Sequence, residues 1–317
     1  MYNVDSTLQT RAQRTMKIEG VISGLLTPFT NDETVNVQAL KEETLFAIER
    51  CGSTAVMVAA AEVQETVRLT QEEKVLCMKA VVDSANGKVP VLVGASGTST
   101  HGAIQLARQA NDIGADAIVV MPPYGVAVKR ALAPPTVQEA IEFYIELSRA
   151  VNLPIVLYNT TTLSTHLPIE ALVKIFELDN VVGMEESSAD YQEISRLCMS
   201  LADKVTILVR GDLLLPTLEL GGHGSIMPVG YSRIGADLYH AYRDHHMEKA
   251  VELQRTISMT PPEELLQRPR VAFFKEILNQ LGLEVGLPRR PSTPLNEQEK
   301  NRIAIFVKEN GLDRLKL

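Results

Sequence analysis

Cysteine and long apolar runs are scarce in this sequence of 317 residues, and each scarcity argues against a class of protein. The three cysteines, Cys51, Cys77 and Cys198, have no CxxC spacing, which argues against a disulfide framework and against a zinc site. No 18 apolar residues run together, and the first 18 residues lack the apolar core of a signal peptide. We therefore expect neither membrane insertion nor export, and a reducing cytoplasm fits.

The sequence also lacks any block of like charge. Its formal net charge of -8 is spread along the chain, so no Lys/Arg stripe indicates a nucleic acid or an anionic membrane as a partner. The glycine fingerprint GxGxxG is absent after the first apolar run, and no metal-ligand spacing occurs. We expect no cofactor and a small-molecule partner.

A repeating pattern of apolar residues extends along most of the chain. Eight apolar runs of strand length alternate with stretches whose apolar residues recur at helical spacing, which favours a parallel sheet covered by helices. Eight such units predict a (β/α)8 barrel, an α/β fold, over residues 19–232, after an N-terminal arm at 1–18 and before a helical C-terminal extension at 233–317. The predicted strands are 21–29, 54–60, 89–96, 117–123, 154–160, 181–187, 205–211 and 224–230.

In a barrel of this class the active site lies at the C-terminal ends of the strands, so the last residues of each run are the candidates. A single polar residue there could simply be solvated at the rim, but several that converge on one mouth indicate a site. The candidates are Thr27, Glu62, Glu65, Ser96, Tyr124, Tyr158, Asn159, Glu185, Glu186, Arg210 and Asp212.

Several motifs resemble one known family. They include GVISGLLTPFTNDETVN, VPVLVGASGTST, ANDIGADAIVVMPPY, LPIVLYN, NVVGMEESS and LPRRPSTPL, and the likeness covers nearly all of residues 19–297. The chain is similar to the dihydrodipicolinate synthase and N-acetylneuraminate lyase superfamily of pyruvate-handling class I aldolases. The resemblance implies a (β/α)8 barrel with C-terminal helices, a small carboxylate substrate, and a homo-oligomer that is a tetramer or a dimer.

The most consequential departure from that family lies at the end of the sixth strand. The family's lysine, which forms a Schiff base with pyruvate, matches Glu185, and a carboxylate cannot form an imine. No lysine ends a predicted barrel strand. Lys129, in the loop after the fourth strand, is the alternative nucleophile, although a loop lysine is ordinarily just solvated.

Other family residues are partly kept. The family's GTTGE, whose threonines bind the pyruvate carboxylate, aligns with residues 61–65, where only the final glutamate is retained. The resemblance makes Tyr158 the proton relay and aligns a second tyrosine with Tyr124 or Gly125, whereas the arginine of the synthases is replaced at about Leu163.

A strand-end glutamate can still perform acid/base chemistry, because partial burial raises a carboxyl pKa toward neutrality. We predict Glu185 as a catalytic acid/base and Glu62 as its carboxylate neighbour. Arg210 could pair with Glu185 or bind a substrate carboxylate. The predicted substrate-binding residues are Glu62, Arg210, Tyr124 and Thr27.

Three functions stay open from the sequence. The first is a lyase or aldolase that acts on a 2-oxo acid or related carboxylate without an imine, with Glu185 as base. The second is a catalytically silent barrel that binds a metabolite or partner. The third is a metal-assisted lyase or hydrolase using Glu62, Glu185 and His166 or His223, which no spacing motif supports.

The two adjacent glutamates should have different roles. Neighbouring side chains of a strand point to opposite faces, so Glu185 and Glu186 cannot both enter the barrel. We predict that Glu185 faces the mouth near Tyr158 and Arg210, and that Glu186 faces the surrounding helices.

Overall fold

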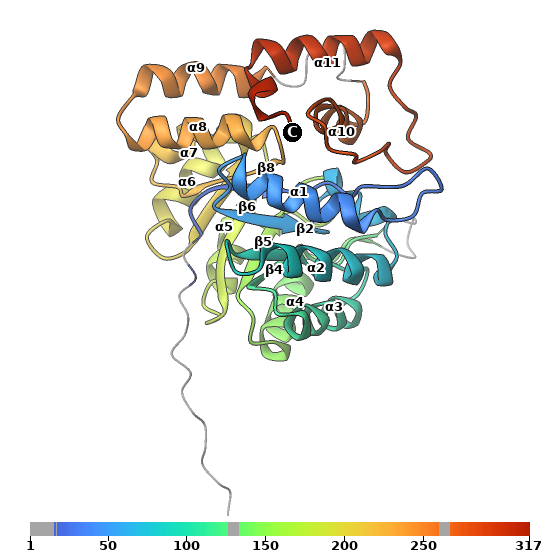
Figure 1. The fold of residues 1–317 in the computed structure, drawn as a ribbon. Coiled ribbons are helices and arrows are strands. Elements are labelled where there is room, and N and C mark those ends of the chain that lie inside the picture. Colours follow the sequence, from blue (N-terminus) through green and yellow to red (C-terminus); the bar gives the residue numbers. More distant parts are fainter. Residues whose placement is uncertain (1–15, 17, 126–132, 260–266) are drawn as a thin grey trace, which may run out of the picture.

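The computed structural model describes residues 16, 18–125, 133–259 and 267–317. Within them, eight parallel strands pair in chain order and close into a barrel (Figure 1). The strands are β1 Gly20–Gly24, β2 Ala55–Val58, β3 Val91–Gly94, β4 Ala117–Val120, β5 Ile155–Asn159, β6 Val181–Glu186, β7 Thr206–Arg210 and β8 Gly224–Pro228. Each falls within a predicted apolar run, or within one residue of it, so the predicted barrel is confirmed.

The strands carry apolar residues on both faces because the parallel sheet is covered on both sides. One buried cluster fills the barrel interior and includes Ile22, Leu92, Val156 and Leu208. A larger cluster lies between the barrel and the helices around it. Since both faces are apolar, a polar side chain that ends a strand stands out as a candidate for function.

Helices follow the strands, and several begin at side-chain caps. Thr70 caps α2 and Thr136 caps α4, each in a capping box with a glutamate three residues later. The helices are α1 Val37–Glu49, α2 Gln71–Ala85, α3 Thr100–Ile113, α4 Val137–Ala150, α5 Ile169–Ile175, α6 Tyr191–Leu201, α7 Leu214–Glu219, α8 Ser232–Arg243, α9 Met247–Ser258, α10 Arg270–Gln280 and α11 Glu297–Glu309. Among these helices, none has both the length and the apolar character needed to cross a bilayer.

The C-terminal region is helical, as predicted. Helix α8 contacts β1 and β8, while α9 packs on α8 and α10 packs on α11. Figure 1 shows α9, α10 and α11 gathered on one side of the barrel, beyond α8 and α1. The division of the chain at residue 232 stays a prediction.

A buried ion pair joins α10 to the loop after β2. Lys275 Nζ lies 2.9 Å from Glu65 Oε2, and the two side chains are 1% and 2% exposed. Glu65 Oε1 also accepts a hydrogen bond from the backbone N–H of Arg289 at 2.9 Å. Glu65, a strand-end candidate from the sequence, therefore faces the C-terminal helices and not the barrel mouth.

The loop after β2 turns sharply across β3. Ala59 has a positive φ of 54°, and a Cβ added at Gly94 would lie 2.0 Å from the Ala59 carbonyl oxygen. Only glycine at position 94 allows this close approach of the two backbones. The turn leads directly into the 3-10 helix η1, Glu62–Gln64, and so brings Glu62 to the barrel mouth.

Candidate active site

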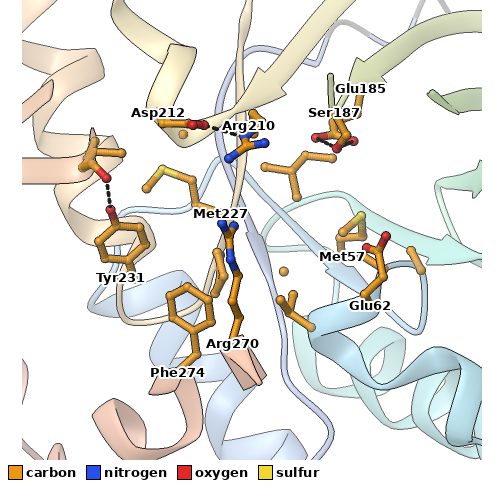
Figure 2. A pocket seen from close by; sticks show the side chains of 18 of the residues that line it. Met57, Glu62, Glu185, Ser187, Arg210, Asp212, Met227, Tyr231, Arg270 and Phe274 are labelled. Carbon is orange, nitrogen blue, oxygen red and sulfur yellow. Dashed lines mark hydrogen bonds and ion pairs between the residues drawn. The ribbon is translucent and has the colours of Figure 1, made fainter. Parts of the chain in front are cut away.

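A cavity of about 490 Å³ opens at the C-terminal mouth of the barrel. Its lining includes five residues that the sequence singled out, namely Glu62, Tyr158, Glu185, Arg210 and Asp212. Figure 2 shows Glu62 and the Glu185–Ser187 pair on one side of the cavity. Five polar strand-end candidates therefore converge on one mouth.

The register of β5 and β6 separates the two adjacent glutamates. Tyr158 is the neighbour of Glu185 across the two strands, and Asn159 is the neighbour of Glu186. Glu185 lines the cavity and is 5% exposed, whereas Glu186 is fully buried and does not line it. The orientation of the pair is the one that alternation along a strand predicts.

The hydrogen-bond partner of Glu185 is a serine. Ser187 Oγ lies 2.9 Å from Glu185 Oε1 and 3.0 Å from Glu185 Oε2, so the serine hydroxyl can donate a hydrogen bond to either oxygen. Burial raises the pKa of the Glu185 carboxyl to about 8, and the Ser187 hydrogen bond and Arg210 offset only part of that rise. Tyr158 and Arg210 lie near Glu185, as predicted, but their own hydrogen bonds are made to Glu62 and Asp212.

Tyr158 and Glu62 form a second pair. The Tyr158 hydroxyl donates to Glu62 Oε2 at 2.8 Å, and the Thr162 hydroxyl donates to Glu62 Oε1 at 2.9 Å. Burial, together with the charges of Glu185 and Glu62, raises the pKa of Tyr158 well above its ordinary value. The phenol therefore keeps its proton near neutral pH and donates it in the hydrogen bond to Glu62.

Arg210 forms an ion pair inside the mouth, with Nε 2.6 Å from Asp212 Oδ1. The far wall of the cavity is formed by residues that the sequence did not single out, namely Met227, Tyr231, Arg270 and Phe274, and Figure 2 shows Arg270 directed into the cavity. They belong to β8, the start of α8 and α10. Sequence reasoning missed them because it considered only the strand ends of the barrel.

Two predicted substrate-binding residues do not line the cavity. The Thr27 hydroxyl donates to the backbone carbonyl of Gln64 at 2.6 Å, and this threonine is 1% exposed. Lys74 Nζ donates to the Tyr124 hydroxyl at 3.3 Å. The structure therefore does not bring Thr27 and Tyr124 to the predicted site, and Lys129 lies outside the described residues.

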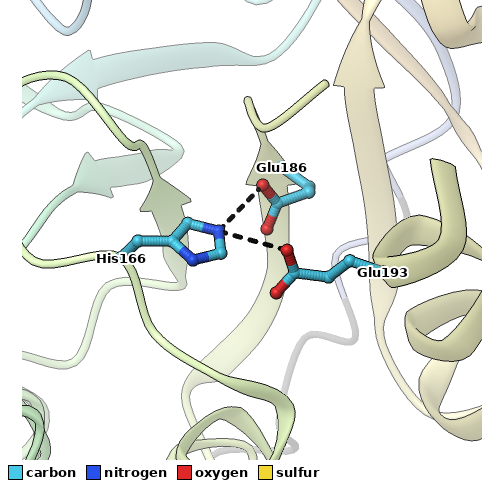
Figure 3. A group of neighbouring side chains, drawn as sticks. All are labelled: His166, Glu186 and Glu193. Atoms are coloured by element: carbon cyan, nitrogen blue, oxygen red, sulfur yellow. Dashed lines mark hydrogen bonds and ion pairs between the residues drawn. The ribbon is translucent and has the colours of Figure 1, made fainter. Parts of the chain in front are cut away.

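Glu186 belongs to a different group, shown in Figure 3. His166 Nε2 lies 3.2 Å from Glu186 Oε1 and 3.8 Å from Glu193 Oε2. Asn159 Nδ2 donates to Glu186 at 2.7 Å. The hydrogen bond between His166 and Glu186 is the main cause that raises the pKa of His166. This group compensates a buried carboxylate, which would be costly without partners.

The metal-binding set considered from the sequence is not assembled. His166 lies with Glu186 and Glu193, not with Glu62 and Glu185. His223 precedes β8, at the opposite end of the barrel from the mouth, where its Nδ1 accepts a hydrogen bond from the backbone N–H of Ile207. Within the part of the chain that the structure describes, neither histidine lines the cavity.

A closed parallel barrel with acid, hydroxyl and guanidinium groups gathered at its C-terminal mouth defines a (β/α)8-barrel protein with an enzyme-like site. The sequence profile of the Dihydrodipicolinate synthetase family matches residues 17–310, and the chain belongs to this family. It is 31% identical over 310 residues to the 4-hydroxy-tetrahydrodipicolinate synthase of Methanopyrus kandleri, covering 93% of this chain and 97% of the relative.

Solved structures agree with this assignment. The chain superposes with a TM-score of 0.83 and 25% identity on YagE, a prophage protein of the dihydrodipicolinic acid synthase family from E. coli K12 in complex with pyruvate, covering 93% of this chain and 99% of that one. The N-acetylneuraminate lyase of Mycoplasma synoviae shares the fold, with a TM-score of 0.81 at 22% identity over 92% and 97% of the two chains. The predicted superfamily is confirmed.

Proposed function

We propose that this protein is a lyase of its family that activates a 2-oxo acid or related small carboxylate by proton transfer, without a lysine Schiff base. One observation carries the proposal. Glu185 occupies the position that the resemblance assigns to the lysine, lines the cavity, and has a pKa of about 8. A carboxyl group that keeps its proton at neutral pH can donate it to a carbonyl oxygen.

The proposed reaction uses three proton transfers. The Tyr158 oxygen takes a proton from the carbon next to the carbonyl while the Tyr158 proton passes to Glu62, the group that its hydroxyl already contacts at 2.8 Å. Glu185 gives its proton to the carbonyl oxygen, which produces a neutral enol, ionised Glu185 and protonated Glu62. In this proposal Glu185 acts as the acid, because burial keeps it protonated, and Glu62 is the final base.

The anchoring of the substrate carboxylate differs in this proposal from the family pattern. The two threonines of the family motif are replaced by Glu62 and Val63, and a charged Glu62 would repel a carboxylate held there. Arg210 is the alternative anchor, because its ion pair with Asp212 is made through Nε. Its two terminal nitrogens can then form a planar fork toward a carboxylate.

The composition of the cavity wall supports the absence of an imine. Among the described residues that line the cavity, none is a lysine. Lys129 lies outside the described residues and is the alternative nucleophile that an experiment must test.

Deuterium exchange into pyruvate tests the proposal without knowledge of the full substrate. Incubation in D2O should replace the methyl protons faster than buffer alone does, as followed by proton NMR. Parallel incubation with pyruvate and borohydride, followed by intact-mass measurement, should give no reduced adduct. An adduct at Lys129 would restore a conventional aldolase, and binding without exchange would favour a silent barrel that holds a metabolite.

A further inference from the structure

A group of three metal-ligating side chains lies behind the barrel mouth, outside the cavity that the proposed function uses. Glu186 ends β6, His166 lies in the loop after β5, and Glu193 lies in the first turn of α6. None of the three lines the cavity. Figure 3 shows both carboxylates directed toward the same nitrogen atom of the imidazole ring.

The donor atoms of this group are spaced like ligands of one ion. His166 Nε2 lies 3.2 Å from Glu186 Oε1 and 3.8 Å from Glu193 Oε2, and one donor atom of each residue lies within 4.8 Å of the other two. Zinc binds nitrogen and carboxylate oxygen at about 2.0–2.2 Å, so two ligand atoms of one ion are at most about 4.3 Å apart. Both measured distances are shorter than this limit, and the third pair needs at most a small side-chain movement.

The chemistry of the three ligands selects the kind of ion. Mg2+ and Ca2+ prefer oxygen ligands alone, whereas an imidazole beside carboxylates favours zinc and other first-row transition metals. Burial raises the pKa of the Glu193 carboxyl, and the charge of Glu186 adds to that rise although His166 opposes it. A divalent cation between the two carboxylates would remove their mutual repulsion.

The buried carboxylate is held in place by neighbouring groups. Asn159 Nδ2 donates to Glu186 Oε2 at 2.7 Å, and the backbone N–H of Ser188 donates to Glu186 Oε1 at 2.6 Å. Asn159 Nδ2 also lies 3.1 Å from the Leu167 carbonyl oxygen and 3.1 Å from His166 Nε2. Because its two protons face three acceptors, the imidazole nitrogen can give up this contact to a metal. Partners of this kind orient the ligands of metal sites.

Ser188 gives a second and independent indication of a ligand. The residue is 5% exposed, and its buried hydroxyl oxygen has no hydrogen-bond partner in the described part of the chain. Because the N–H of the same residue contacts Glu186, this hydroxyl lies beside the group. A buried hydroxyl without a partner is costly, and a water bound to an ion at this place would give it one.

We propose that His166, Glu186 and Glu193 bind one Zn2+ ion, with water in the remaining coordination position. The side chains of His166 and Glu193 are 24% and 25% exposed, which leaves the ion a path from solvent. The ion joins the loop after β5, the end of β6 and the start of α6, and so fixes three elements behind the mouth. The site goes beyond the proposed function and does not rest on it.

Calorimetric titration of the full chain with Zn2+ tests the site. Wild type that has been treated with EDTA and dialysed should bind one Zn2+ ion per chain. Mg2+ should bind about tenfold or more weakly, because it prefers oxygen ligands and keeps several waters. Zn2+ should also raise the midpoint of thermal unfolding by a few degrees, since an ion that binds the folded state stabilises it.

Glu193→Gln removes one ligand and nearly keeps its shape, so the affinity for Zn2+ should fall by about tenfold or more. His166→Asn should have the same effect. Glu170→Gln is the matched control, because it changes an exposed glutamate of α5 outside the group and should keep the wild-type affinity. Circular dichroism without metal checks that each variant folds.

Anomalous diffraction from wild-type crystals grown with Zn2+ locates the ion without any variant. The expected result is one zinc peak in contact with His166, Glu186 and Glu193. Zinc bound only at other residues, no saturable binding of Zn2+, equal affinity for Mg2+, or full affinity in folded Glu193→Gln would each overturn the assignment. The group would then be an ion pair that compensates the buried charge of Glu186.

Discussion

Glu185 shows how one residue sets the chemistry available to a barrel mouth. At the position where the family resemblance places an amine, this chain holds a carboxyl group that is 5% exposed and whose pKa is raised to about 8 by burial. An amine can form an imine, whereas a protonated carboxyl can only donate or exchange a proton. For this reason the proposed function uses acid catalysis of enol formation and not covalent catalysis.

We expect Glu185→Gln to reduce deuterium exchange into pyruvate by about 100-fold or more, the scale of a lost general acid. Glutamine matches the shape of the acid but cannot give up a proton. Wild-type exchange should also fall as the pH rises through about 8, because Glu185 then loses the proton that it donates.

Proton NMR at a series of pH values measures both effects, and circular dichroism checks that the variant keeps its fold. Full activity of Glu185→Gln, or an unchanged pH profile of exchange in wild type between pH 7 and 9, would contradict the assigned role.

At the scale of elements, a second buried glutamate joins α1 to the loop that follows β1. Glu43 is fully buried, and its Oε1 accepts a hydrogen bond from the backbone N–H of Leu26 at 2.6 Å. Burial raises the pKa of this carboxyl from 4.5 to about 8, although the Leu26 hydrogen bond and Lys275 oppose the rise. Glu43 is therefore a neutral acid inside the fold at neutral pH and supports packing, not catalysis.

A raised carboxyl pKa makes stability depend on pH with a definite sign. The folded state holds the Glu43 proton more tightly than the unfolded state, so this contribution is fully present below pH 4.5 and is lost as the pH rises through about 8. Within that window the loss is about 1.4 kcal/mol per pH unit for one group. Glu43→Gln cannot ionise, so its free energy of unfolding should fall less between pH 5 and pH 8 than that of wild type.

Thermal unfolding at several pH values measures the difference between wild type and the variant. Glu42→Gln changes an exposed glutamate of the same helix and should follow the wild-type profile. Parallel pH profiles for wild type and Glu43→Gln would contradict the neutral, buried state of Glu43.

At the scale of the whole molecule, the candidate site belongs to both the barrel and the C-terminal helices. Barrel strands and their loops supply Glu62, Tyr158 and Glu185, while α10 supplies Arg270 and Phe274. The buried pair of Lys275 with Glu65 connects α10 to the loop that carries Glu62. The position of α10 is therefore coupled to the geometry of the mouth.

We expect the intact protein to form a homo-oligomer, a tetramer or a dimer, because its family resemblance implies such an assembly. Sedimentation equilibrium or light scattering across a range of protein concentrations measures the mass directly. A chain of 34.8 kDa that stays monomeric at every concentration would contradict this expectation.

Much of the candidate site could be predicted from the sequence because strands impose local rules. A period of two residues decides that Glu185 and Glu186 face opposite sides, and parallel pairing brings successive strand ends to one mouth. Tyr158, Glu185 and Arg210 were found in this way, and Glu62 follows β2 across a short turn.

The sequence by itself determined the eight-stranded pattern and the family, because each depends on residue type and spacing along the chain. Only the tertiary structure decided the partners. Ser187 and not Arg210 contacts Glu185, Glu65 turns to Lys275, and Arg270 reaches the cavity from a helix far along the chain. Such contacts depend on how loops and helices pack in three dimensions, and periodicity along the chain carries no information about them.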